Sequence, residues 1–254
     1  MFMFLPGLCS VSFRALSPRQ IVTLAAHTGL FCIEWGGDVH VPPGDFGNAA
    51  RVARLTEKFG LRCASYGSYY RIGAGQSAQL PVILDTAEAL GVSSVRIWCG
   101  TQASSSVLPE TLEAMRLEAQ KAAALAEKRK MTLSLECHPG TLTDDWRAAL
   151  NFIQAVGQPA LLMYWQPNQW RDAAYNLESV QKLSPLITNV HVFHWIQKVK
   201  YPLEAGVPVW RRYLSALDCT RDHALLLEFM HDGAPESLEN TARALKQILE
   251  EPLK

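Results

Sequence analysis

One pattern occurs three times in this chain, as HTGLFCIEW (residues 27–35), KFGLRCASY (58–66) and ALGVSSVRIW (89–98). In each copy a glycine follows an amphipathic stretch and precedes a short apolar run, and the glycines at 29, 60 and 91 stand 31 residues apart. A glycine just past a helix supplies the left-handed residue that ends it, and the apolar run after it is typical of a strand. The pattern therefore predicts a repeating unit of helix and strand.

The length of the chain accommodates eight such units, because 254 residues divided by eight is about 32 residues per unit. The expected strands are short and almost continuously apolar, which is typical of parallel strands buried on both faces. They are Met3–Cys9, Leu30–Glu34, Leu61–Ser65, Ser94–Trp98, Thr132–Glu136, Ala160–Trp165, Thr188–Val192 and Ala224–Glu228. This alternation predicts an α/β fold, a (β/α)8 TIM barrel, in a single domain over residues 1–254. An open doubly wound sheet fits less well, because no GxGxxG motif follows the first strand.

Helix signals support this assignment. The stretch Ser17–Gln20 (SPRQ) is a capping box with proline at the first helical position. Apolar residues recur with helical spacing over Pro109–Arg129 and again over Leu238–Leu249. The seventh unit is the weakest, since Gln197–Trp210 has the character of a long loop. This segment and a second loop, Gly67–Gln76, are both expected to close over a substrate.

The composition is that of a globular protein, with 48% apolar and 19% charged residues. The 24 basic residues balance the 24 acidic ones, so no global charge attracts a nucleic acid. No apolar run reaches the ~18 residues that a membrane span needs, and the six cysteines include no CxxC pair. We expect a cytoplasmic protein that binds neither nucleic acid nor membrane. Apolar and aromatic residues in its loops leave room for a homodimer.

Side chains that could act in catalysis, bind a metal or bind a substrate occur at the ends of the expected strands. In a barrel of this kind the active site lies at the C-terminal ends of the strands. The residues there are Glu34 and His40 after the second strand, Trp98 on the fourth, Glu136 and His138 after the fifth, Trp165, Gln166 and Gln169 after the sixth, His191, His194 and Trp195 at the seventh, and Glu228 at the eighth. Carboxylates and imidazoles therefore converge on one rim.

Two of these carboxylates close apolar runs, LSLE (133–136) and LLLE (225–228). An ionised carboxylate in such a place is costly unless it is paired or bound to a metal. A catalytic or metal-binding role would explain carboxylates at these two positions, and so would a structural salt bridge to a neighbouring arginine or lysine. His191, between two valines, is either a functional residue or a satisfied core histidine. The tryptophans at the strand ends either pack on the apolar face of a sugar ring or fill the barrel mouth.

Together these residues resemble the xylose isomerase-like (β/α)8 superfamily, in its branch of sugar and sugar-phosphate isomerases and epimerases. The resemblance covers nearly the whole chain. It is carried by IEWGGDVH (33–40), RIW (96–98), ECHPGTLT (136–143), YWQPN (164–168), VHVFHW (190–195) and LE (227–228). Each fragment alone is weak, whereas their order and spacing together are fairly specific.

The resemblance implies a divalent metal, Mn²⁺, Mg²⁺, Zn²⁺ or Co²⁺, held by residues on the last four strands. By position these ligands fall on Glu136, Gln166, His191 and Glu228. It also implies that Glu136 and Glu228 remove and return a proton of a carbohydrate through an enediolate. The residues that we expect to bind this substrate are Glu34, His40, Trp98, His138, Trp165, Gln169, His194 and Trp195.

The chain departs from the family on the sixth strand, where Gln166 and Gln169 replace an aspartate and a histidine. A glutamine carbonyl can ligate a hard ion but brings no charge, so metal affinity should fall. The loss keeps two alternatives open: a catalytically decayed sugar-binding or regulatory barrel, and a metal-free lyase or dehydratase. A metal-dependent nuclease of the same superfamily is a further alternative, which the zero net charge and the sparse ligand set disfavour.

Overall fold

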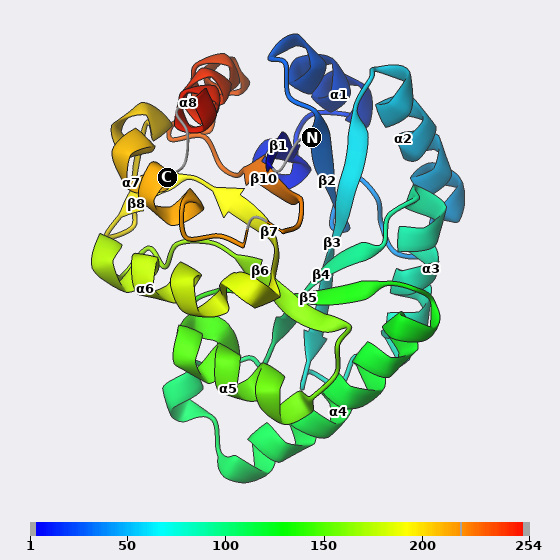
Figure 1. Cartoon of the computed structure of the whole chain (residues 1–254). Coiled ribbons are helices and arrows are strands. Elements are labelled where there is room, and N and C mark those ends of the chain that lie inside the picture. The colour runs from blue at the N-terminus through cyan, green and yellow to red at the C-terminus, as the bar shows by residue number, and fades with distance from the viewer. Residues whose placement is uncertain (1–3, 219, 251–254) are drawn as a thin grey trace.

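The computed structural model describes residues 4–218 and 220–250. Eight parallel strands form a closed barrel, in which β1 lies between β2 and β10 and so joins the two ends of the sheet (Figure 1). The barrel strands are β1 (Phe4–Cys9), β2 (Cys32–Gly36), β3 (Arg62–Ile72), β4 (Ser94–Cys99), β5 (Thr132–Glu136), β6 (Leu161–Trp165), β7 (Ile187–Val192) and β10 (His223–Leu227). The predicted (β/α)8 barrel is confirmed. Met3, the expected start of the first strand, lies outside the described residues.

Within the described residues, eight α-helices surround the barrel (Figure 1). They are α1 (Pro18–His27), α2 (Phe46–Lys58), α3 (Leu80–Leu90), α4 (Pro109–Lys128), α5 (Trp146–Val156), α6 (Ala173–Leu183), α7 (Val207–Leu214) and α8 (Leu238–Glu250). None of these helices is long and apolar enough to cross a lipid bilayer. The five cysteines in the described part of the chain are free thiols.

Local signals in the sequence account for the helix ends. The Ser17 hydroxyl accepts a hydrogen bond from the Gln20 backbone N–H, and the Gln20 side chain accepts one from the Ser17 N–H, so the predicted capping box begins α1. Gly29, Gly60 and Gly91 follow helices with φ of +67°, +73° and +78°. This left-handed conformation is strained for a residue with a Cβ atom, which explains the repeated glycine.

Side chains alternate between the interior of the barrel and the surrounding helices. Glu34 and His191 come from β2 and β7, which are not neighbours in the sheet, so their contact crosses the interior. The next residue on β2, Trp35, points outward and donates its Nε1–H to Thr56 of α2 at 3.1 Å. The two-residue period of a strand therefore separates the residues that enter the site from those that pack on the helices.

The predictions for two loops are wrong in part, because both segments include regular secondary structure. β3 continues to Ile72, so the first half of the expected Gly67–Gln76 loop is strand. In the seventh unit, Gln197–Trp210 includes the second strand of a hairpin, β8 (His194–Ile196) with β9 (Val199–Tyr201), and the first half of α7. Short local elements of this kind leave little periodicity in the sequence, which explains why the segment has the character of a loop.

Candidate active site

Three buried charged side chains form a chain across the barrel interior. The Arg96 guanidinium donates its Nε–H to Glu34 Oε1 at 3.0 Å and an Nη1–H to Glu136 Oε2. The indole of Trp98 donates its Nε1–H to the same Glu136 oxygen at 2.5 Å. Arg96 thereby holds carboxylates from two different strands, and it fixes Glu136 through Oε2 while Oε1 faces another partner.

That partner is His191, which lies at the centre of the site. Its Nδ1 atom is 3.1 Å from Gln166 Oε1, 3.4 Å from Glu228 Oε2 and 3.8 Å from Glu136 Oε1. The other ring nitrogen, Nε2, lies 3.4 Å from Glu34 Oε1. The structure thus brings three of the four expected metal ligands, Glu136, Gln166 and Glu228, around a ring nitrogen of the fourth, His191, although their role as ligands stays a prediction.

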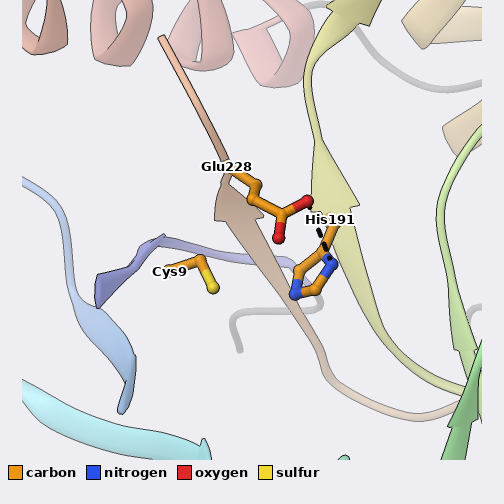
Figure 2. Close-up of side chains that lie close together, drawn as sticks. All are labelled: Cys9, His191 and Glu228. Carbon is orange, nitrogen blue, oxygen red and sulfur yellow. Dashed lines mark ion pairs between the residues drawn. The ribbon is translucent and has the colours of Figure 1, made fainter. Parts of the chain in front are cut away.

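A cysteine that the sequence analysis treats as a core residue also reaches this cluster. Figure 2 shows Cys9 at the end of β1 with its thiol directed toward His191, and Glu228 pairing with the same imidazole. Ligand atoms of Cys9, His191 and Glu228 lie within 4.8 Å of one another. These three buried residues are a group that could hold a metal ion.

Glu34 is enclosed by protein rather than open to a substrate. Its side chain is 0% exposed and accepts hydrogen bonds from the Cys9 thiol at 3.3 Å and the Ser65 hydroxyl at 2.9 Å, in addition to Arg96. Its two oxygens are thus occupied by protein groups, and the expected contact between Glu34 and a substrate stays a prediction. This carboxylate can orient His191 instead, because a proton on Nε2 directed at Glu34 leaves Nδ1 unprotonated and able to bind a cation.

The surroundings shift the pKa values of the carboxyl groups in the cluster in opposite directions. Burial opposes ionisation of Glu34 and Glu136, but the positive charges of Arg96 and His191 outweigh burial and hold the pKa of each carboxyl below its usual value. Burial instead raises the pKa of Glu228 to about 7, against the opposing charge of His191. Burial would lower the pKa of His191, but the surrounding carboxylates raise it.

The geometry and charge of the cluster fit a divalent cation. Donors bonded to one cation at ~2.1 Å lie about 3.0–3.4 Å apart, close to the 3.1 and 3.4 Å from His191 Nδ1 to Gln166 Oε1 and Glu228 Oε2. Three ionised carboxylates and one guanidinium leave two negative charges when the imidazole is neutral. One divalent cation balances them, and carboxylate, amide and imidazole ligands suit Mn²⁺, Mg²⁺ or Zn²⁺.

Trp98 links this cluster to the rim of the barrel. Its half-buried ring meets His138 at 5.3 Å between ring centroids and Tyr69 at 5.2 Å, and the Arg71 guanidinium lies 4.5 Å from its centroid. His138 donates Nδ1–H to the Pro139 carbonyl at 2.8 Å. Two of the expected substrate residues, Trp98 and His138, are therefore neighbours beside Glu136.

The opposite side of the rim carries His194 and Trp195 of the β8–β9 hairpin. The ring of Trp195 lies 6.2 Å from that of Phe229, and Lys200 Nζ lies 4.9 Å from the Trp195 centroid. His194 and Trp195 line a cavity of about 430 Å³ between this hairpin, α6 and α7. A second cavity, of about 670 Å³, opens between the loops that follow β4, β5 and β6.

Three expected substrate residues lie apart from the cluster. Trp165 is fully buried outside the barrel, where it donates to Ser179 of α6 at 3.1 Å, so the expectation for Trp165 is corrected. The strand period instead turns its neighbour Tyr164 inward, against His191. His40 binds the Ser10 hydroxyl and the Leu16 carbonyl through its two ring nitrogens, which favours a structural role. Gln169 is half-buried in the β6–α6 loop.

Sequence reasoning missed Arg96, Cys9 and Arg71 as members of the site. Arg96 lies in an apolar run, as Glu136 does. A charged residue in such a position is unusual, and this could have indicated that Arg96 belongs to the site. Cys9 ends its strand, but a buried thiol is common enough to carry little information. Arg71 fell in a segment expected to be loop, and the tyrosines at 69 and 70 were the sign of a longer strand.

Comparison with known proteins agrees with this architecture. The model of the family described as xylose isomerase-like TIM barrel matches residues 22–250. Similar solved structures include the probable 3-DHS dehydratase AsbF from Bacillus anthracis, with 19% identity, a TM-score of 0.80, and coverage of 97% of this chain and 99% of that one.

Two epimerases are also similar in structure. An L-ribulose 3-epimerase has 15% identity and a TM-score of 0.72, with coverage of 96% of this chain and 93% of that one. A D-allulose 3-epimerase from Methylomonas sp. has 14% identity and a TM-score of 0.71, with coverage of 98% and 99%. No curated protein sequence matches the chain. At these identities the structural likeness shows the fold alone.

Proposed function

Because the chain belongs to the xylose isomerase-like TIM barrel family, we propose that it is an isomerase or epimerase of a small sugar or sugar phosphate that transfers a proton through an enediolate. The observation that carries the proposal is the pairing of Glu136 with Glu228. Both carboxyl groups face Nδ1 of His191, at 3.8 and 3.4 Å. Their environments drive their pKa values apart, one below its usual value and one to about 7.

This separation assigns an acid and a base. A pair of titratable groups with opposite pKa shifts is the arrangement that general acid–base catalysis uses. Glu136, ionised beside Arg96, is suited to take the proton from the carbon next to the substrate carbonyl. Glu228, whose pKa burial raises to about 7, is the more basic carboxyl group of the pair and is suited to return a proton. Return to the neighbouring carbon is isomerisation, and return to the opposite face of the same carbon is epimerisation.

The ligands for a divalent cation would be Glu136, Gln166, His191 and Glu228, with Glu34 orienting the histidine. When bound, the cation would supply polarisation of the substrate carbonyl and stabilisation of the enediolate charge. Arg96 contributes on its own by holding Glu136 in place through Oε2. Gln166 is held in turn, because its Nε2–H donates to the Cys137 carbonyl at 2.7 Å and so directs Oε1 at His191.

The rim supplies surfaces for the body of the substrate. Trp98 and Trp195 are half-buried aromatic side chains on opposite sides of the mouth. An indole face packs against the C–H face of a sugar ring, and a neighbouring imidazole can hydrogen-bond its hydroxyl groups. His138 beside Trp98, and His194 beside Trp195, are the imidazoles that this role requires.

The same acid and base favour a dehydratase as the second candidate. Elimination of water begins with the same proton removal by Glu136. The bond to the neighbouring hydroxyl then breaks, and Glu228 gives its proton to the departing oxygen, which leaves as water. The raised pKa of Glu228, about 7 because of burial, favours this reaction, since a weaker acid holds its proton until the hydroxyl departs.

Deuterium exchange tests the proposal across a panel of candidate sugars. Protein loaded with Mn²⁺, Mg²⁺, Zn²⁺ or Co²⁺ is incubated in D₂O with aldoses, ketoses and their phosphates, and the sugars are followed by proton NMR. We expect loss of one carbon-bound proton signal together with a new isomer or epimer. Formation of an unsaturated product would assign the dehydratase. Binding of a sugar without any exchange would contradict the proposal and favour the decayed binding protein.

A further inference from the structure

Arg71 is a cation of the rim that forms no ion pair within the described part of the chain. Among the described residues, no carboxylate lies within ion-pair distance of its guanidinium, and its one hydrogen bond runs from Nη1 to the Gly100 carbonyl at 2.7 Å. Arg14, on the same rim, donates to Asp38 Oδ2 at 2.5 Å and to the Tyr69 hydroxyl at 2.9 Å. A guanidinium carries five N–H donors, so Arg71 retains most of its binding capacity.

The sheet holds Arg71 in a defined position. Arg71 and Trp98 are paired residues of β3 and β4, and the register between these strands shifts between Gly67 and Arg71. Such an irregularity re-aims a side chain at the end of a strand. The Gln76 side chain accepts the Arg71 backbone N–H at 2.9 Å, and the guanidinium lies over the Trp98 ring. The side chain is therefore ordered before any ligand arrives.

A single indole ring separates Arg71 from the proposed base. One edge of Trp98 donates to Glu136 Oε2 at 2.5 Å, while its ring supports the Arg71 guanidinium at 4.5 Å. A small molecule that presents its reacting carbon to Glu136 can therefore reach Arg71 with its far end. His138, 5.3 Å from Trp98 between ring centroids, stands on the same part of the rim.

We propose that Arg71 is a specificity-determining residue that binds an anionic group of the substrate, a carboxylate or a phosphate, and so makes the substrate a sugar acid or a sugar phosphate. The planar fork of a guanidinium matches two oxygens of either group. A neutral sugar gains nothing from an unpaired, half-buried cation. An anion that approaches three carboxylates gains much from one, because the positive charge offsets their repulsion.

The inference rests on the proposed function for the position of the reacting carbon, so its test has a part that does not require turnover. Inorganic phosphate and malonate are titrated separately into the metal-loaded protein by calorimetry. We compare the wild type with Arg71→Gln, with Arg71→Lys, and with Arg116→Gln, a surface arginine of α4 paired with Glu113. We expect one site for one of the anions, with affinity at least about tenfold weaker in R71Q and unchanged in R116Q.

Arg71→Lys separates charge from geometry. We expect R71K to keep part of the affinity, because it retains the positive charge and loses the fork. It also serves as the second variant if R71Q fails to fold. If neither anion binds the wild type, or if R71Q and R71K both bind as tightly as the wild type, the anion site is refuted. The preferred anion identifies the group as a phosphate or a carboxylate.

Turnover distinguishes failure of this inference from failure of the proposed function. Matched neutral sugars, sugar acids and sugar phosphates are compared in the deuterium exchange assay. We expect exchange in an anionic member, with KM raised about tenfold or more in R71Q and kcat nearly unchanged, since Arg71 binds a part of the substrate that does not react. Exchange confined to neutral sugars would overturn the inference and leave the function standing. Anion binding without any exchange would support the anion site and overturn the function.

Discussion

The imidazole of His191 places Nε2 3.4 Å from Glu34 Oε1, across the interior of the barrel from β7 to β2. This contact directs Nδ1 at Gln166, Glu228 and Glu136. A carboxylate behind a metal-binding histidine fixes the orientation of the ring and raises its basicity. We therefore expect Glu34 to be a positioning residue that acts on the chemistry through His191.

The first prediction concerns this contact. Glu34→Gln keeps the shape of the side chain but removes the charge that orients His191, so affinity for Mn²⁺ should fall by about 10–100-fold. Calorimetric titration with Mn²⁺ measures it. The matched control is Ser65→Ala, which removes a different partner of the same carboxylate and should change affinity little. Equal affinities in E34Q and S65A would show that Glu34 does not act through the histidine.

Metal binding should depend on pH. A cation must displace protons from Glu228, whose pKa is about 7, and from His191, whose pKa is raised above its usual value. Both groups are increasingly protonated as pH falls through 7, so affinity should decrease toward acid, by up to about tenfold per pH unit for each proton displaced. Mn²⁺ titrations between pH 5.5 and 8.5 test this. An affinity that stays constant over that range would rule out these two residues as ligands.

Arg96 should be essential to the stability of the site. Its guanidinium is buried and neutralises Glu34 and Glu136 together, so Arg96→Met leaves two buried carboxylates without a partner. The free energy of unfolding should drop by about 3–5 kcal/mol. Arg116→Met, on the exposed face of α4, should change it by no more than about 0.5 kcal/mol. Urea denaturation compares the two variants, and similar midpoints would contradict the role assigned to Arg96.

The missing charge on β6 can be restored. Gln166→Glu keeps the length of the side chain and adds a negative charge 3.1 Å from His191 Nδ1, so metal affinity should rise by about tenfold or more. Gln169→Glu adds the same charge in the β6–α6 loop and should change affinity much less. The comparison is made by Mn²⁺ titration at pH 8. A larger gain in Q169E than in Q166E would place the metal elsewhere.

Much of the fold could be predicted because each repeat of helix, glycine and apolar strand has a recognisable pattern over about 30 neighbouring residues. That Glu136, Gln166, His191 and Glu228 lie close together could be predicted because strand ends converge in any closed barrel, whereas their role as metal ligands follows from the resemblance and stays a prediction. The sequence analysis expected Trp165 to bind the substrate, but the sequence does not show which of two adjacent aromatic residues faces inward. Trp165 turned out and Tyr164 turned in, since both bury equally well and only the sheet register separates them.

Contacts between residues that are far apart in the chain could not be predicted from the sequence. Arg96 binds carboxylates 62 and 40 residues away, and no local pattern encodes that pairing. The extension of β3 to Ile72 depends on its pairing with β4 beyond a shift in register. Arg71 therefore emerged as a rim residue only from the three-dimensional structure.

The central claim is that Glu136 and Glu228 together move a proton of the substrate. Its most direct test is the rate of deuterium exchange into the substrate in Glu136→Gln and Glu228→Gln, with Glu57→Gln on the surface of α2 as the control. The account predicts that each site variant remains folded and loses about 10²–10⁴-fold in exchange rate, while E57Q keeps the wild-type rate. Exchange at the wild-type rate in either folded site variant would contradict it.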